Sequence, residues 1–382
     1  MDHTAPAITP PPPAVRPFRR KPSLPALTGI RTIFALTIIA FHFSNAAMFG
    51  IFAPMVNNAF IFVGCFFLLS GFILAYNYGD RGPSLSKREF WLARFARLYP
   101  VYLLALLISY QMLLAEWHYQ THLHFVEGVI LTPLLLQGFS PLLATFWNTV
   151  AWTLSSEVML YIAFPWIVGL RWPRSPRKLA GLVVAFWALG MVLPALYMLL
   201  QPDGFAHVNR YTPGIWLRTL KFTPIPYAPT FLAGMALGLL QDRATISSRV
   251  RLWLSGVMLV VLAAVFCWGI DALPYPMLHV GLLTPLFALL IIGLSGNHWI
   301  ARIFAFRPIL IVGEATYCLY LLHFNGWILI HKYSLPARLH VAALDPWISY
   351  AVLVAFSVAA FYWVEIPGRR WILNRWSHRR TG

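Results

Sequence analysis

Charged residues are scarce in this sequence, and acidic residues are the scarcest. Only 11% of the 382 residues are charged, with 12 Asp or Glu against 29 Lys or Arg. A soluble domain has about 25% charged residues, so an ordinary soluble protein is excluded. Cysteine is also rare: Cys65, Cys267 and Cys318 are odd in number, lack CxxC spacing and sit in apolar runs. This pattern indicates neither a disulfide framework nor a zinc site, but small packed apolar side chains.

Apolar residues make up most of the chain: 59% of the residues are hydrophobic and 16% are aromatic. Such a composition is typical of membrane proteins, whose aromatic side chains gather at the interfaces. The net charge of +17 would also suit a nucleic-acid-binding protein, but the basic residues fall in short clusters between apolar runs and not on one folded face. The sequence therefore predicts an all-α integral membrane protein that has the lipid bilayer as a partner and binds no nucleic acid.

Ten runs match the roughly 20 mostly apolar residues that a membrane-spanning helix needs. They cover residues 27–46, 57–77, 99–116, 151–170, 179–200, 226–241, 252–270, 277–295, 309–330 and 347–366. Lys and Arg concentrate in cytoplasmic loops, and a cytoplasmic N-terminus puts 23 of the 29 basic residues on that side. The five on the other side are Arg210, Arg218, Lys221, Lys332 and Arg338. We expect a bundle of about ten transmembrane helices with both termini cytoplasmic.

The two ends of the chain differ from its middle. Residues 1–23 are Pro-rich and then basic, which predicts a disordered cytoplasmic tail. Residues 24–372 form the predicted transmembrane domain, and residues 373–382 a short basic cytoplasmic tail. Within the domain, Gly234 and Gly238 form a GxxxG pair. In a bundle of this size we expect the pair to allow close packing of two helices of the same chain rather than dimerisation.

The first apolar run contains two ionisable residues, Arg31 and His42, in RTIFALTIIAFHF. Eleven residues at about 100° each come within roughly 20° of three full turns, so both side chains lie on one helix face, about 16 Å apart along its axis. Taken singly, Arg31 could snorkel to the headgroups and His42 could be a packed interfacial histidine. Ionisable groups at such depths usually face a bundle interior or a wet cavity, and the shared face predicts one cavity through the membrane.

An outer layer of polar residues is predicted at the depth of His42. Glu157, in a helix that enters from the outside, lies about two turns below the outer face, and His323 lies at a comparable depth. Histidine is the usual proton acceptor near neutral pH, and a nearby carboxylate can orient it and stabilise its protonated form. Such a layer suits the activation of a hydroxyl group.

An inner basic layer is predicted at the depth of Arg31. Arg94 and Arg97 precede Pro100, which suits a first helical turn, so both arginines fall in the lead-in to the third helix. They could be ordinary cytoplasmic anchors, but the forked guanidinium group also matches the geometry of a phosphate. An acyl coenzyme A, long, thin and anionic at one end, fits a cavity that joins this layer to the outer one.

Six segments, in this order, resemble the membrane-bound acyltransferase 3 family. The first helix of that family carries an arginine and a histidine separated by ten residues, as Arg31 and His42 are in LTGIRTIFALTIIAFHF. The other segments are FFLLSGFILAY at 66–76, RFARLYPVY at 94–102, WTLSSEVMLYIAFP at 152–165, GEATYCLYLLHF at 313–324 and VEIP at 364–367. Thr28 and Thr32 depart from the pattern, because they stand where relatives often have an aspartate and a glycine. The resemblance covers about residues 24 to 372.

The resemblance implies transfer of an acetyl or other short acyl group from cytoplasmic acyl-coenzyme A, such as acetyl-CoA, to a hydroxyl of an exopolysaccharide, a lipid-linked glycan or a similar acceptor. The implied catalytic residues are His42, Arg31, Glu157 and His323, and the implied contacts to coenzyme A are Arg94, Arg97 and Arg31. His42 is the expected base. Ser70 and Ser155 lie in matching motifs, where we expect packing or hydrogen bonding. We expect a stand-alone O-acyltransferase without the esterase-like domain that many relatives carry.

Two other function classes remain open on the sequence. A secondary transporter would also place charged residues in a membrane cavity, although transporters often show paired repeats with broken helices and no convincing repeat is visible here. A non-enzymatic subunit of a polysaccharide-export machine would have little use for a buried Arg–His face. We expect the protein in the bacterial inner membrane, with polysaccharide-assembly proteins among its candidate partners.

Two polar segments are predicted on the outer side. Residues 203–222 could contact an anionic glycan, with Trp216 stacking on a sugar, or could simply seal the outer face at the headgroups. His118, His122 and His124 superficially resemble a metal-binding spacing. Without further ligands we predict a solvated or acceptor-facing segment there and no metal site.

Overall fold

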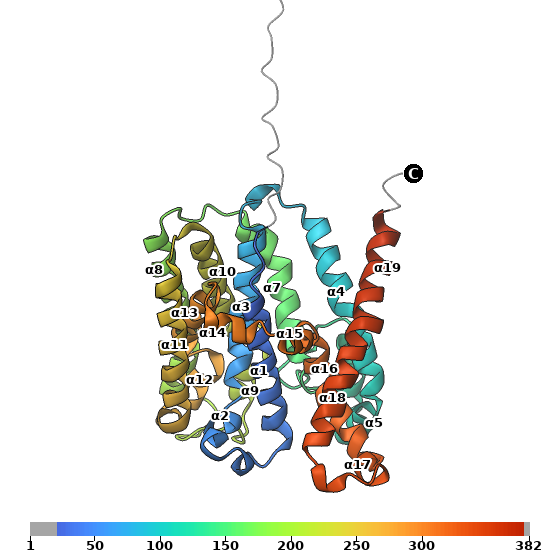
Figure 1. Ribbon diagram of the computed structural model, residues 1–382. Helices are drawn as coiled ribbons and strands as arrows, with labels where there is room; N and C mark the ends of the chain where they lie inside the picture. Colours follow the sequence, from blue (N-terminus) through green and yellow to red (C-terminus); the bar gives the residue numbers. More distant parts are fainter. Residues whose placement is uncertain (1–20, 378–382) are drawn as a thin grey trace, which may run out of the picture.

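The computed structural model describes residues 21–377, and within this range the chain is helical and contains no strand. The helices stand side by side in one bundle (Figure 1). The predicted disordered tail over residues 1–23 falls almost entirely outside the described residues. The predicted C-terminal tail over residues 373–382 begins inside the last helix, which continues to Ser377.

Seven helical stretches of the described chain are long and apolar enough to cross a membrane. They are α1 (Pro25–Phe43), α3 (Ile61–Tyr78), α4 (Lys87–Ile108), α8 (Pro176–Leu200), Ser248–Ala272, Tyr275–Leu294 and Trp347–Trp376. The last three comprise α11 (Ser248–Ala264), α12 (Tyr275–Val280) with α13 (Thr284–Leu294), and α18 (Trp347–Ala360) with α19 (Ile366–Ser377). The predicted class, an all-helical multi-pass membrane protein, is confirmed at this level.

Three of the ten predicted spans correspond to shorter helices in the bundle. These are α7 (Trp152–Val168), α10 (Ala228–Arg243) and α16 (Thr316–Lys332), with 17, 16 and 17 residues. At 1.5 Å per residue each is about 25 Å long, slightly less than the roughly 30 Å hydrocarbon core, so the count of ten stays a prediction. The remaining helices are α2 (Ala53–Asn57), α5 (Tyr110–Tyr119), α6 (His122–Leu131), α9 (Ile215–Phe222), α14 (Trp299–Phe304), α15 (Arg307–Glu314) and α17 (Leu335–Arg338).

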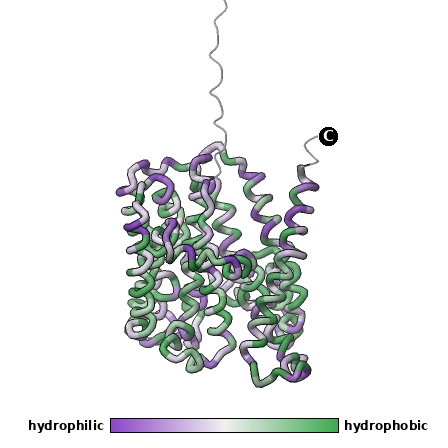
Figure 2. The backbone as a smooth tube through the Cα atoms, viewed as in Figure 1, coloured by the Kyte–Doolittle hydropathy of each residue, from purple (hydrophilic) through white to green (hydrophobic). Residues whose placement is uncertain are grey.

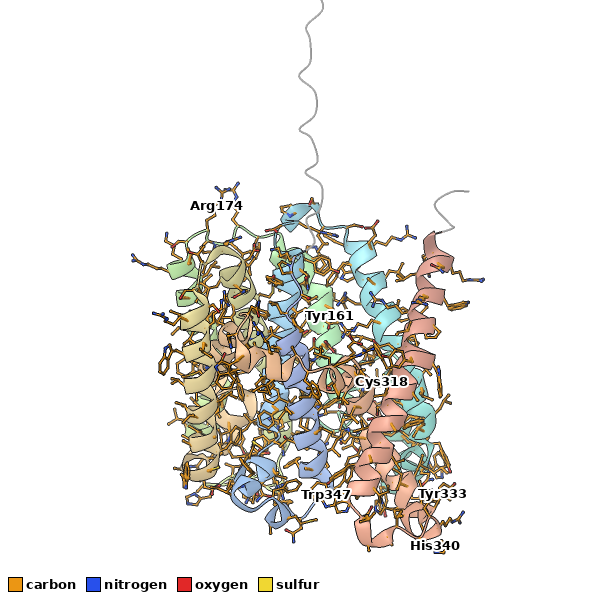
Figure 3. All side chains as sticks on the ribbon, in the orientation of Figure 1. Tyr161, Arg174, Cys318, Tyr333, His340 and Trp347 are labelled. Atoms are coloured by element: carbon orange, nitrogen blue, oxygen red, sulfur yellow. The ribbon has the colours of Figure 1, made fainter. Side chains whose placement is uncertain are left out.

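The two ends of the described chain lie at the same end of the bundle (Figure 1). Hydrophilic residues gather at this end, whereas hydrophobic residues predominate along the height of the bundle (Figure 2). Arg174 lies at this end, which we call the terminal face, and Tyr333, His340 and Trp347 lie at the opposite end, the distal face (Figure 3). This arrangement agrees with the predicted topology, in which the termini and the loop containing Arg174 share one side. That this side is cytoplasmic stays a prediction.

The third predicted helix has the wrong bounds, because α4 starts well before residue 99. The Ser86 Oγ atom accepts a hydrogen bond of 3.4 Å from the backbone N–H of Glu89, and this Ser-x-x-Glu pattern is a known helix start. Arg94 and Arg97 therefore lie inside a continuous helix and not in its lead-in. Pro100 is in the helix interior, where its missing N–H leaves one backbone carbonyl without its usual helical partner.

Two predicted spans are broken in the structure. The run 309–330 is divided at Ala315 into α15 and α16, and α15 lies near mid-height of the bundle (Figure 1). The run 277–295 is divided into α12 and α13 near Gly281, whose φ of +119° lies in the left-handed region that favours glycine. Because of the first break, α16 begins inside the bundle at Thr316, beside the cavity described below.

The packing of α3 against α10 depends on the predicted GxxxG pair. A Cβ atom on Gly234 would lie 2.1 Å from the carbonyl oxygen of Leu68, and one on Gly238 would lie 2.4 Å from that of Phe72. Both glycines of α10 therefore allow its backbone to touch the backbone of α3, as small residues do in membrane helix pairs. The prediction that this pair packs within the chain is confirmed.

We expect Gly234→Ala to lower the stability of the protein by about 1–3 kcal/mol, the usual cost of an atom forced into a packed interface. The matched control is Gly181→Ala in α8, because a Cβ atom there would meet nothing within 4 Å and alanine favours helix by up to about 1 kcal/mol. Thermal unfolding of the purified variants in detergent should show a lower Tm for the first and an unchanged or higher Tm for the second. Equal Tm values would contradict the close α3–α10 contact.

Candidate active site

A cavity of about 230 Å³ lies among α1, α3, α4, α7 and α16. Four of the predicted site residues line it: Arg31 from α1, Arg94 and Arg97 from α4, and Glu157 from α7. Arg94 and Arg97 reach it together because residues three apart share one helix face. The rest of the wall is largely apolar and aromatic, with hydroxyl groups from Ser, Thr and Tyr side chains. We call this space the arginine cavity.

Two of the three arginines have no anionic partner in the described part of the chain. The Nε atom of Arg94 is buried and makes no hydrogen bond, and its guanidinium carbon lies 5.6 and 5.9 Å from the ring centres of Phe90 and Tyr161. The Arg31 guanidinium carbon lies 5.9 Å from the ring centre of Phe66, and none of the ion pairs found within residues 21–377 includes it. Enclosed charges are costly unless they are paired, so the arginine cavity favours an anionic ligand.

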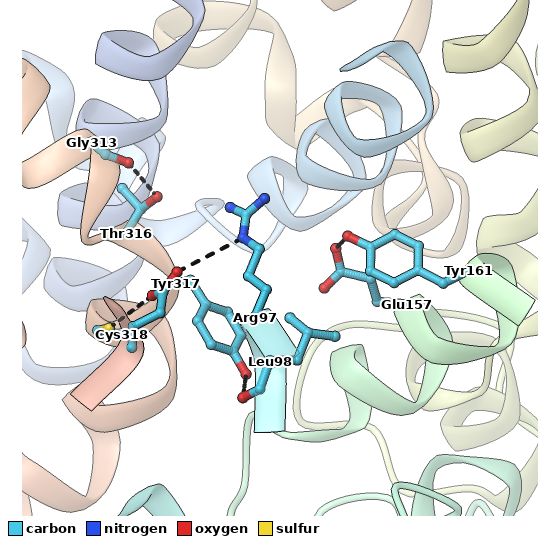
Figure 4. A network of polar contacts seen from close by, with 9 residues as sticks. Arg97, Leu98, Glu157, Tyr161, Gly313, Thr316, Tyr317 and Cys318 are labelled. Carbon is cyan, nitrogen blue, oxygen red and sulfur yellow. Dashed lines mark hydrogen bonds and ion pairs between the residues drawn. The ribbon is translucent and has the colours of Figure 1, made fainter. Parts of the chain in front are cut away.

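Arg97 does have a carboxylate partner. Its Nε atom lies 3.9 Å from an Oε atom of Glu365, and the Cys318 thiol donates to the other carboxylate oxygen over 3.3 Å (Figure 4). Glu365 stands between α18 and α19 and is buried. Glu365 was not assigned to the site from the sequence, because the VEIP segment was used only as a family motif. The signal that could have identified Glu365 is an acidic residue at the edge of an apolar run.

Glu157 forms a cluster of oxygen atoms on the wall of the arginine cavity. The Tyr161 hydroxyl, one turn further along α7, donates to the Glu157 carboxylate (Figure 4), and Ser70 Oγ lies 3.3 Å from the same carboxylate oxygen. Glu157 thus lies with the arginines, and the prediction that it shares a layer with the histidines was wrong. The reason is that α7 begins inside the protein: Asn148 and Ala151, just before it, are fully buried.

His42 and His323 lie together, as predicted. His42 is in the last turn of α1, and its ring centre is 5.3 Å from that of His323. The Nδ1 atom of His323 is 2.6 Å from the backbone carbonyl oxygen of Tyr320. A carbonyl oxygen only accepts, so Nδ1 carries the proton and Nε2 keeps a free electron pair. That Nε2 atom is buried and has no partner in residues 21–377, which makes it available as a proton or hydrogen-bond acceptor.

The histidine pair does not line the arginine cavity, but Tyr320 connects the two parts of the site. The Tyr320 side chain lines the cavity, and its backbone carbonyl holds His323 one turn further along α16. The site therefore consists of a cationic cavity and, beyond Tyr320, a pair of histidines. Within residues 21–377 no group of His, Cys, Asp and Glu side chains could hold a metal ion.

The family model for an acyltransferase domain matches residues 24–366, nearly the whole chain. The chain belongs to this acyltransferase family. Acyltransferase MdmB from Streptomyces mycarofaciens is 28% identical over 329 residues, which cover 79% of this chain and 78% of that protein. Peptidoglycan O-acetyltransferase OatA from Listeria monocytogenes is 23% identical over 333 residues, covering 79% of this chain and 49% of that longer protein. No solved structure matches the chain.

Membership of the acyltransferase family makes this protein an enzyme that transfers acyl groups in a membrane setting. All six family-like segments lie within the matched residues or overlap their end. Five of the six segments contribute a residue to the wall of the arginine cavity: those that hold Arg31, Ser70, Arg97, Glu157 and Tyr320. The VEIP segment adds Glu365, which pairs with Arg97. The family motifs, far apart in the sequence, thus converge on one part of the bundle.

Proposed function

We propose that this acyltransferase is an O-acyltransferase of the bacterial inner membrane. It moves an acetyl or other short acyl group from acyl-coenzyme A to a hydroxyl of an exopolysaccharide, a lipid-linked glycan or a similar acceptor. Its termini are cytoplasmic, so the donor enters from the terminal face. The O-acetyltransferase among the relatives supports this reaction, and a transporter or an export subunit would not require the family's transferase domain.

The observation that carries the proposal is the pair of unpartnered arginines in the arginine cavity. Coenzyme A bears phosphate groups at one end and the acyl thioester at the other. Arg31 and Arg94 supply guanidinium groups that no carboxylate of the described chain neutralises, and arginine binds phosphate with two parallel hydrogen bonds. Arg97, held by Glu365, adds a third cation in a fixed position. The largely apolar wall suits the thin pantetheine arm.

The histidine pair supplies the proton acceptor for the acceptor hydroxyl. The hydroxyl oxygen attacks the thioester carbon while its proton passes to His42, the half-buried member of the pair. The carbon–sulfur bond then breaks and coenzyme A leaves as a thiolate, which takes up a proton. His323 offers its Nε2 electron pair to the protonated His42 and stabilises it, as the carboxylate does in a catalytic triad. A position at the C-terminal end of α1 also favours a positive charge on His42.

Glu157 and Ser70 form part of the wall of the arginine cavity and take no part in deprotonating the acceptor hydroxyl. The Glu157 carboxylate accepts from Tyr161 and Ser70, and the Tyr161 ring lies 5.9 Å from the Arg94 guanidinium carbon. These contacts fix the wall of the cavity beside Arg94 before the donor arrives. We assign it a positioning role in donor binding.

The proposal is tested by reconstituting the full chain in liposomes with radiolabelled acetyl-CoA and a panel of glycan and small hydroxyl acceptors. We expect label in an acceptor, in an ester that mild alkali releases, with one coenzyme A thiol formed per acyl group transferred. A chain that instead moves a labelled solute across the liposome membrane and transfers no acyl group would contradict the proposal and favour a transporter.

Ser70 gives a test of direct transfer. Because its hydroxyl bonds to Glu157 and Tyr161, we expect Ser70→Ala to lose at most about 100-fold in rate, as for one hydrogen bond to a charged group. We also expect no hydroxylamine-sensitive label on the wild-type protein during turnover. Loss of transfer in Ser70→Ala together with labelled wild-type protein would replace direct transfer by an acyl-serine intermediate.

A further inference from the structure

A second set of cations lies near the histidine pair, in α9 and in the loop between α8 and α9 that runs along the distal face (Figure 1). The Arg210 guanidinium carbon is 5.1 Å from the ring centre of Phe41, and the Phe41 ring is 5.0 Å from the ring of His42. The loop therefore places a positive charge beside the proposed base. Arg210 is half-buried, and its guanidinium also contacts the Tyr211 ring and hydroxyl.

Lys221 is the second cation, and it is almost fully enclosed, with 9% of its surface exposed. Its ammonium group donates to the carbonyl oxygen of Arg210 over 3.2 Å and lies 5.1 and 5.5 Å from the ring centres of Phe222 and Tyr275. No carboxylate forms an ion pair with it within residues 21–377. An ammonium group has three donors, so this one keeps donors for a further oxygen ligand. Burial, with the nearby Arg218, lowers the pKa of Lys221 to about 8.

Asp203, the carboxylate that lies closest to α9 in the loop, is engaged elsewhere. The two Asp203 oxygens accept from the backbone N–H groups of Trp216 and Leu217 at the start of α9, over 3.1 and 2.8 Å. The third cation, Arg218, donates to backbone and hydroxyl oxygens of the 141–145 segment, over 2.9 and 3.3 Å. Arg218 thus ties α9 to the 141–145 segment, whereas Arg210 and Lys221 are left without a negative charge.

A cavity of about 390 Å³ lies next to the residues that contact these two cations, although neither cation lines it. Its wall includes the polar side chains of Asn58, His207, Asn209 and Asp271, and also Tyr275, whose ring lies under the Lys221 ammonium. Asn209 directly precedes Arg210 in the chain. These hydrogen-bonding side chains suit a polyhydroxylated molecule. Asp271 is exposed and lies on the cavity wall, and it forms no ion pair with Lys221.

We propose that Arg210 and Lys221 form a binding site for an oxyanion, a phosphate or carboxylate group, that the acyl acceptor carries. The inference rests on the proposed acyltransferase function and names the acceptor class: a hydroxyl compound with an anionic group. Binding of that group beside Phe41 brings a neighbouring hydroxyl to His42, and the rest of the acceptor occupies the polar cavity. The same cations could hold the phosphate of a lipid headgroup, which has the same chemistry.

The test is binding of inorganic phosphate to the purified full chain in maltoside detergent, with saturating coenzyme A so that the arginine cavity is occupied. We expect Lys221→Gln and Arg210→Gln each to weaken phosphate binding about 10- to 100-fold, the effect of one charge-assisted hydrogen bond. The matched control is Lys332→Gln, because Lys332 is exposed and directly precedes Tyr333, which lies at the distal face (Figure 3); this variant should bind like the wild type. Equal phosphate affinity in all four proteins would overturn the site.

The two sources of the oxyanion are separated by adding phosphatidylglycerol to the detergent. If the lipid displaces phosphate from the wild type, the site holds a lipid headgroup and the acceptor assignment is overturned; if phosphate binding persists, the assignment to the acceptor stands. Arg210→Gln is the more exposed variant and keeps the test valid should Lys221→Gln fail to fold. The readout needs no turnover, so failure of the oxyanion site and failure of acyl transfer are distinguishable.

Discussion

His42→Ala is expected to lower acyl transfer about 10²- to 10⁴-fold, the usual contribution of a general base. His42 lies against His323, whose buried Nε2 atom has no other partner in the described chain. Removing the imidazole therefore leaves the acceptor hydroxyl without its proton acceptor, while the arginine cavity, on the other side of Tyr320, keeps all its lining residues. The loss should appear in kcat, with the KM for acetyl-CoA nearly unchanged.

The measurement is the initial rate of label transfer from acetyl-CoA in liposomes that contain equal amounts of each protein. His118→Ala is the matched control, because His118 is exposed at the end of α5 and lies outside the site. It should transfer at the wild-type rate. If His42→Ala also transfers at that rate, His42 has a structural role and the proton acceptor must be sought elsewhere, first at His323.

Arg94→Gln is expected to raise the KM for acetyl-CoA about 10- to 100-fold with a smaller effect on kcat. This is the range for one hydrogen bond to a charged group. Arg94 suits the test because no carboxylate of the described chain depends on it, so its loss leaves no buried charge unpaired. The same change at Arg97 would strand Glu365, and lost folding could then be mistaken for lost donor binding.

The matched control for Arg94→Gln is Arg88→Gln, on the same helix but exposed and near Trp376. It removes the same charge from α4 without touching the arginine cavity, so its KM should stay at the wild-type value. The KM of each variant is measured from saturation curves of the transfer rate against acetyl-CoA concentration. An equal rise in KM for both variants would mean that only the overall positive charge attracts the donor, and not a site formed by Arg94.

Much of the site follows from the sequence because α1 is regular. A continuous helix over Pro25–Phe43 carries Arg31 to the cavity and His42 to the second histidine. The spacing of eleven residues predicts that both face one cavity, but His42 does not line the arginine cavity. The grouping of Arg31 with Arg94 and Arg97 was also predicted, from depth alone. Periodicity is informative for Arg31 and His42 because both residues lie in one unbroken helix.

The misses arise at the starts and breaks of helices, which the apolar pattern does not show. The depth of Glu157 was inferred on the assumption that α7 starts at the outer face. The chain before α7 is buried, however. Apolar composition does not distinguish a helix that starts at the outer face from one that starts inside the protein. The break at Ala315 likewise lies in an apolar run without a proline. Glu365 went unassigned because its partner Arg97 is more than 250 residues away in the sequence, and only the fold brings the two together.

Equilibrium binding of coenzyme A to the wild type, His42→Ala and Arg94→Gln in lipid nanodiscs distinguishes the two parts of the site. The proposed mechanism separates donor binding in the arginine cavity from proton transfer at the histidine pair. It predicts that His42→Ala binds coenzyme A as tightly as the wild type, although it barely transfers, and that Arg94→Gln binds about 10- to 100-fold more weakly. Wild-type affinity in Arg94→Gln, or weakened binding in His42→Ala alone, would contradict it.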